Sequence, residues 1–170
     1  MTVRGAPRLR VPEDYLRSFI FGVQDGLVST TGVVVGISAG VHDRAVIALA
    51  AFVAVTVEAS SMAAGQFSSE KAVHEADTAG RHRDSLLLGA LIMFVSYLLA
   101  GLVPIVPMIL LGPPYASPVA IAAALTALLI VGYLKGRLVG TRPLRSALEL
   151  GVIGGAATMI GLVVGYLLRT

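Results

Sequence analysis

The stretch FIFGVQDGLVSTTGVVVGISAG, residues 19–40, decides how this chain folds. It is apolar enough and long enough for a helix to cross the hydrocarbon of a membrane, which needs roughly 20 residues. Yet Gln24 and Asp25 lie inside it, followed directly by Gly26. A carboxylate in hydrocarbon costs roughly 3 kcal/mol on insertion scales, and intramembrane acids are usually functional. The position of Asp25 therefore needs an explanation.

The composition of the whole chain is that of an integral membrane protein. Of its 170 residues, 56% are hydrophobic and 14% are charged, and the mean hydropathy is +0.85. Such a chain is too apolar for an ordinary soluble domain. We expect one all-α domain over residues 1–170, a bundle of five transmembrane helices. The expected spans are about 19–40, 45–67, 86–107, 119–134 and 148–168. The third is placed to end near Pro107, because prolines kink or break a helix.

Lys and Arg indicate the orientation. Of the 13 such residues, all except Arg44 and Arg169 lie before the first span, between the second and third, or between the fourth and fifth. The positive-inside rule then predicts a cytosolic N-terminus and an outside C-terminus. Within the cytosolic segment 1–18, VPEDYLRSF is either a short amphipathic helix on the membrane surface or a plain tail. Because topology explains the basic clusters, we expect no nucleic-acid partner.

Counting along the first two spans pairs two polar positions in depth. Asp25 lies eight residues beyond Arg17, and Met62 lies eight residues before Glu70. Both are then about 12 Å from the cytosolic boundary, so helices running in opposite directions could bring them face to face. Glu58 shares a helix face with Met62, one turn deeper in the membrane.

Asp25, Glu58 and Met62 form a candidate metal site. Oxygen ligands alone suit Mg²⁺, Ca²⁺ or Mn²⁺, and an added thioether favours softer ions such as Fe²⁺. Asp25 and Glu58 are also suited to carrying protons, which would compete with the metal. The plainer interpretation is that Met62 only packs and that Glu58 is a neutral hydrogen-bonding group. We expect no permanently bound cofactor, and the absence of cysteine excludes thiolate sites.

Glycines recur at a spacing of four residues in the first and last spans. The pairs and triplet are Gly22 and Gly26; Gly32, Gly36 and Gly40; Gly151 and Gly155; and Gly161 and Gly165. This spacing allows helix backbones to approach closely, either within a bundle or across a dimer.

Four segments together resemble the vacuolar iron transporter (VIT) family. They are FGVQDGLVSTTGVVVGISAG, EASSMAAGQFSSEK, YLLAGLVPIVPMIL and GYLKGRLVGTRPLRSALELGVIGGA, in the family's order. The resemblance implies a dimeric five-helix transporter that exports Fe²⁺ from the cytosol in exchange for protons, with Mn²⁺, Co²⁺ or Zn²⁺ as alternative ions. The family's metal path includes the aspartate of DGL and the methionine of SM, here Asp25 and Met62. The match for Glu58 is weaker, because only some members carry it.

The chain departs from the family between the second and third spans. Well-studied members carry a long carboxylate-rich helical domain there, whereas this chain has only SSEKAVHEADTAGRHRDS. The chain thus resembles the shorter members that lack the domain. A small cytosolic capture site is one interpretation of this segment, and a solvated loop with helical ends is the other. The candidate capture residues are Glu70, His74, Glu75 and Asp77, with His82 close by.

Other functional classes fit less well. CDP-alcohol phosphotransferases also have Asp–Gly in a span, but their Ala–Arg and further aspartates are missing after Asp25. His42, His74 and His82 lie in connections and form no HExxH motif. We therefore expect no enzyme. A non-transporting membrane scaffold packed through GxxxG helices stays the alternative. The residue usage hints at a bacterial cytoplasmic membrane, with a vacuolar-type membrane expected for a eukaryotic chain.

Overall fold

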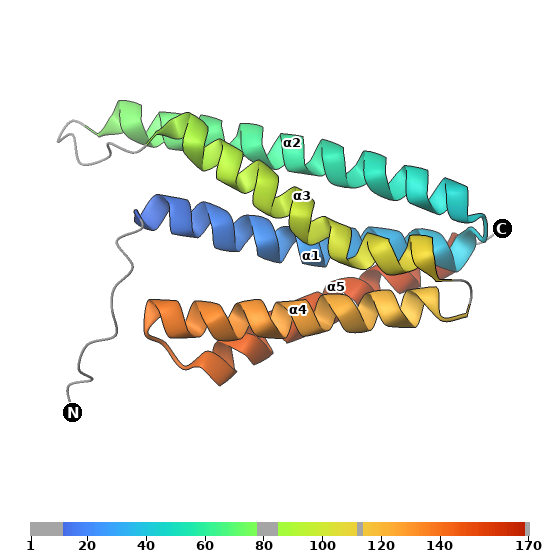
Figure 1. Ribbon diagram of the computed structural model, residues 1–170. Helices are drawn as coiled ribbons and strands as arrows, with labels where there is room; N and C mark the ends of the chain where they lie inside the picture. Colours follow the sequence, from blue (N-terminus) through green and yellow to red (C-terminus); the bar gives the residue numbers. More distant parts are fainter. Residues whose placement is uncertain (1–11, 78–84, 112–113, 169–170) are drawn as a thin grey trace.

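A computed structural model describes residues 12–77, 85–111 and 114–168, which form five helices (Figure 1). They are α1 (Glu13–Gly40), α2 (Arg44–Ala76), α3 (Leu86–Leu110), α4 (Ala116–Val139) and α5 (Pro143–Leu167). Each is long enough and apolar enough to cross a membrane. This confirms the predicted all-helical fold with five spans, and the chain is a multi-pass membrane protein.

All five helices extend past the predicted spans at one end or both. Residues 13–18, expected to form a separate surface helix or a tail, are the first turns of α1. Glu13 and Asp14 favour this start, because negative charge stabilises a helix N-terminus. At its other end, α2 continues to Ala76, where Lys71 and Glu75 pair one turn apart at 3.7 Å. Hydropathy reports the thickness of the hydrocarbon, so it misses helical turns outside it.

The prolines of α3 do not end that helix. It passes through Pro104 and Pro107 to Leu110, three residues beyond the expected end. The N–H of Leu111 donates to the Pro107 carbonyl at 2.9 Å and closes the last turn. Membrane helices tolerate proline because neighbouring helices and local adjustments satisfy the carbonyls that it leaves free.

Helix α1 is the centre of the bundle. It contacts all four other helices, whereas α2 contacts only α1 and α3 among the described helices. Figure 1 shows α2 on one side of α1 and α4 and α5 on the other, while α3 runs from beside α2 across α1. The larger buried core joins Val34 of α1 to Val55 of α2 and to Tyr97 and Ile105 of α3. Residues of α1 therefore face several neighbours at once.

Glycines allow α1 to take this central position. Gly32 and Gly36 lie against Gly161 and Gly165 of α5, and a Cβ atom on Gly36 would meet the Gly161 carbonyl oxygen at 2.8 Å. On the other side of α1, Gly22 lies against Met93 of α3, where an added Cβ would meet the backbone oxygen at 2.9 Å. These glycines thus pack helices within one chain, which is one of the two uses that their spacing predicted.

A sharp turn connects α4 to α5. Gly140 follows the end of α4 with φ 76°, a left-handed conformation that favours glycine. Pro143 then opens α5, where its missing N–H costs nothing because the first N–H groups of a helix have no partner in that helix. This turn lets the two helices run back along each other.

Candidate metal centre

The Glu58 carboxylate is held by hydrogen bonds from two neighbouring helices. Its Oε2 atom accepts from the Tyr97 hydroxyl of α3 at 2.6 Å and from Ser29 Oγ of α1 at 2.9 Å. The Tyr97 side chain is almost completely buried, with 1% exposed. Glu58 itself is half-buried on α2. Three helices therefore meet at one carboxylate inside the membrane-spanning part of the bundle.

Asp25 adds a second carboxylate to this region. It lies on α1 one helical turn before Ser29, so the two share a helix face. Asp25 is half-buried and lies close enough to Glu58 for the two carboxylates to interact electrostatically. Like charges repel strongly where water is scarce. A cation or protons would relieve that repulsion.

Two contacts fix the alignment of α1 and α2. Ser29 meets Glu58, and twelve residues away on each helix Arg17 meets Glu70. The helices run in opposite directions with the same rise, so positions equally far from these contacts lie at the same level. Asp25 and Met62 are such positions, eight residues from Arg17 and Glu70 respectively. They also lie one turn from Ser29 and Glu58, on the helix faces that meet.

Met62 has surroundings that fit either packing or ligation. Its side chain is half-buried and packs against the core cluster that contains Tyr97. A thioether in such a place is a soft, adaptable group. Ser60, two residues before Met62, is exposed, and its hydroxyl donates to the Thr56 carbonyl of its own helix at 2.7 Å. The Ser60 hydroxyl is thus already hydrogen-bonded to a backbone carbonyl of its own helix.

The candidate capture residues are spread along the last turns of α2. Glu70 is buried, and its carboxylate contacts the Arg17 guanidinium and accepts from Gln66 Nε2 at 3.0 Å. Glu75 is exposed and pairs with Lys71. Across the described ranges, no three His, Asp or Glu side chains gather so that they could hold a metal ion. A capture site at Glu70, His74, Glu75 and Asp77 stays a prediction, and His82 lies outside the described residues.

Comparison with known proteins identifies the family. The model of the VIT family matches residues 16–89 and 76–166, which is most of the chain. The chain belongs to the VIT family. This VIT-family chain is 29% identical to "Vacuolar iron transporter homolog 1" of Arabidopsis thaliana over 157 residues, 85% of the chain and 78% of that relative.

Shorter matches have higher identity. The VIT-family chain is 39% identical to "Vacuolar iron transporter 1" of Oryza sativa subsp. japonica over 70 residues, 41% of the chain. It is 36% identical to "Vacuolar iron transporter homolog 2" of Arabidopsis thaliana over 72 residues, 42% of the chain. The chain spans only 28% and 37% of the lengths of these two relatives.

The sequence analysis missed two residues of the candidate site. Ser29 follows Asp25 by four residues, so the helical period alone could have assigned it to the same face. Tyr97 gave no such indication, because it comes from α3 and its distance from Glu58 depends on how the helices cross. Both donate to Glu58, and together they fix the direction in which its carboxylate points.

Proposed function

We propose that this VIT-family protein carries a divalent transition metal across the membrane, with Fe²⁺ as the favoured ion and Mn²⁺ as the next. The main support for this proposal is the orientation of the Glu58 carboxylate. Tyr97 and Ser29 hold it close enough to Asp25 for the two carboxylates to interact electrostatically. Asp25, Glu58 and Met62 are the proposed ligands. Two carboxylates attract a cation strongly in a low-dielectric region, and a thioether favours a transition ion. The relatives are named vacuolar iron transporters, which agrees with iron as the ion.

Proton exchange is the proposed coupling. Carboxylate ligands must lose their protons before they bind a metal, so metal binding and protonation exclude each other at Asp25 and Glu58. A site that is open to each side in turn would then exchange metal for protons. The charge of the site changes little in such a cycle, which keeps the cost of moving it through the membrane low.

The proposed direction is out of the cytosol, with the start of α1 on the cytosolic side. The orientation is supported by the distribution of Lys and Arg, of which only Arg44 and Arg169 are expected on the other side. The membrane is proposed to be the cytoplasmic membrane of a bacterium or a vacuolar-type membrane of a eukaryote. Protease accessibility of a tag added before Met1, in intact and in permeabilised cells, tests the orientation.

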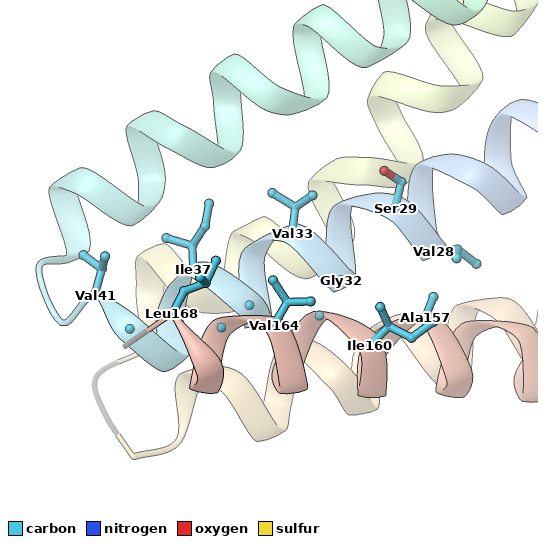
Figure 2. A pocket seen from close by; sticks show the side chains of 14 residues that line it. Val28, Ser29, Gly32, Val33, Ile37, Val41, Ala157, Ile160, Val164 and Leu168 are labelled. Carbon is cyan, nitrogen blue, oxygen red and sulfur yellow. The ribbon is translucent and has the colours of Figure 1, made fainter. Parts of the chain in front are cut away.

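A homodimer is proposed as the working form. An apolar groove of about 700 Å³ runs along α1 and α5, with Ser29 toward one end and Val41 and Leu168 toward the other (Figure 2). A second copy would cover apolar surface of this kind, although lipid would also wet it. The mass of the detergent-solubilised protein, corrected for bound detergent, decides between one copy and two.

Cytosolic capture at Glu70, His74, Glu75 and Asp77 is the weaker proposal. Changing Glu75 and Asp77 together to amides would raise the metal KM of transport if these residues collect the ion, with Glu70 left unchanged because it also contacts Arg17 of α1. An unchanged KM would favour the solvated-segment interpretation.

The scaffold alternative has less support. It relied on GxxxG surfaces that are free to bind other helices. Gly32, Gly36, Gly161 and Gly165 pack against one another within the chain, although the groove that they line stays open to a further helix. A scaffold also has no use for two interacting carboxylates between its helices.

Transport by the purified protein in proteoliposomes is the deciding experiment. Fe²⁺, Mn²⁺, Co²⁺ and Zn²⁺ are offered under an imposed pH gradient, and metal uptake and proton release are followed together. The native chain is expected to move metal against protons, whereas Asp25→Asn loses coupled transport. Glu149→Gln is the matched control, because Glu149 is an exposed acid at the start of α5. No metal movement by the native chain, or intact coupling in Asp25→Asn, would contradict the proposal.

A further inference from the structure

A polar cluster joins α1 to α2 at the end of the bundle where α1 begins. The Arg17 guanidinium contacts the Glu70 carboxylate. Gln66 Nε2 donates to Glu70 Oε1 and to Ser18 Oγ, each at 3.0 Å. Ser18 and Glu70 are buried, with 0% and 6% exposed. Side chains at a helix end would normally be hydrated, so this end of the α1–α2 contact is unusually closed.

The start of α3 adds to the closure. The backbone N–H of Ser85 donates to the Tyr15 hydroxyl at 2.8 Å, which ties the start of α3 to α1. The cavity left between Ser18, Glu70 and Gly89 is only about 10 Å³. That volume is at the lower limit for a single water molecule. A hydrated metal ion could not pass through it.

This cluster lies on the same two helices as the candidate metal centre, about two turns nearer the start of α1. Arg17 and Glu70 are each eight residues, about 12 Å, from Asp25 and Met62 on the same two helices. Toward the other end of α1, an apolar groove lies between α1 and α5 rather than between α1 and α2, and Ser38 Oγ lies 3.1 Å from Ser117 Oγ of α4. The polar closure described above belongs to the end of the α1–α2 contact where α1 begins.

Arg17 and Glu70 differ in how firmly they are held. The Glu70 side chain is 7% exposed, whereas that of Arg17 is 61% exposed. The guanidinium, which also lies 3.6 Å from Asp14 on α1, is therefore open to water, whereas the carboxylate is enclosed. A buried carboxylate with a removable cation suits a contact that opens and closes.

We propose that the Arg17–Glu70 ion pair is a gate that closes the space between α1 and α2 on the side where α1 begins. When the pair separates, water reaches the level of Asp25 and Met62 from that side. The identity of the ion that would pass the gate rests on the proposed function. The closure itself can be tested without any metal.

Single cysteines make the test direct, because the chain has no cysteine of its own. Met62→Cys is the reporter thiol, in full-length protein in proteoliposomes. Its rate of reaction with a membrane-impermeant maleimide is measured with the reagent on one side or on the other, and cleavage of an N-terminal tag identifies the side. The reporter is combined with Arg17→Ala or with Glu70→Gln. The second variant keeps the side-chain shape and the bond from Gln66, so it preserves the fold.

Opening the gate should raise labelling from the α1-start side by about tenfold, the size of losing one charge-assisted hydrogen bond. Labelling from the other side should stay the same. Lys71→Ala is the control, since it removes the exposed Lys71–Glu75 pair on the same helix end and should change neither rate. Equal rates with and without the ion pair would overturn the gate, and so would an equal rise from both sides, which indicates general loosening. The labelling rates do not depend on transport. The test of the gate and the Asp25→Asn test of the proposed function can therefore fail independently.

Discussion

The Tyr97 hydroxyl on α3 donates a 2.6 Å hydrogen bond to Glu58 Oε2 on α2, and both side chains lie beside α1. Tyr97 is held from behind as well, because its backbone lies against Gly26 of α1 with no room for a Cβ atom between them. The tyrosine thus connects the packing of α1 and α3 to the direction of a carboxylate on α2. A shift of α3 would move a proposed metal ligand.

Tyr97→Phe removes only the hydroxyl and tests this connection. It should destabilise the protein by about 1–3 kcal/mol, because a hydrogen bond to a carboxylate is lost in a buried place. Metal transport should fall as well, since Glu58 keeps only Ser29 as a donor. Thermal unfolding in detergent and proteoliposome uptake measure the two effects. Tyr133→Phe is the control, because Tyr133 is 39% exposed on α4 and should change neither quantity. Unchanged transport in Tyr97→Phe would remove Tyr97 from the site.

Met62→Leu tests whether the thioether selects the metal. The two side chains have similar volume, so the fold should lose less than about 1.5 kcal/mol. If sulfur is a ligand, the preference for Fe²⁺ over Mn²⁺ should fall by roughly tenfold, equivalent to about 1.4 kcal/mol. Competition between the two ions in the transport assay measures the ratio. Met159→Leu, at a position 60% exposed on α5, should leave it unchanged. The same ratio in both variants would assign Met62 to packing alone.

Gly161→Ala tests the close contact of α1 and α5. A Cβ atom there would lie 2.8 Å from the Gly32 carbonyl carbon, so the helices must separate. We expect a loss of about 1–3 kcal/mol, the usual cost of overpacking. Gly155→Ala on the same helix meets nothing within 4 Å and is the matched control. The melting temperature in detergent should fall only for Gly161→Ala, and equal values would show that α1 and α5 pack less tightly than described.

Gly140→Ala tests backbone conformation without packing. No atom lies within 4 Å of the position of an added Cβ, but the residue has φ +76°. An L-residue in the left-handed region costs about 1–2 kcal/mol, and that is the expected loss of stability. Gly65→Ala is the comparison, since Gly65 has equal space and lies inside α2. There alanine should stabilise by about 0.5–1 kcal/mol because it favours a helix. A Gly140→Ala variant that is as stable as the native protein, or more stable, would contradict this account.

The helices could be predicted from the sequence, but their ends could not. Apolar runs near 20 residues long identified all five spans, because a membrane demands that length. The end of α2 was placed at residue 67, nine residues before Ala76. The last turns of that helix depend on pairs such as Lys71 with Glu75 and on the contact of Glu70 with Arg17. Hydropathy carries no information about such contacts.

Part of the candidate site could likewise be predicted from the sequence, and part of it could not. The common level of Asp25 and Met62 follows from counting residues, because all α-helices rise equally per residue. The hydrogen bonds of Glu58 depend on which helix crosses beside α2. No residue near Glu58 in the sequence indicates that Tyr97 is its partner. The spacing of the glycines likewise showed that helices approach closely without showing which ones. Crossing geometry is a property of the assembled bundle.

The contact of Gly32 and Gly36 with Gly161 and Gly165 has a consequence for biosynthesis. Spans emerge from the ribosome in order, so the first helix is inserted long before its glycine partner on the last helix exists. During that interval the bare backbone surface of α1 faces lipid or an insertion factor. The bundle can close only after the C-terminal helix has been made, and a chain truncated before residue 161 would carry an unfilled groove that membrane quality control could recognise.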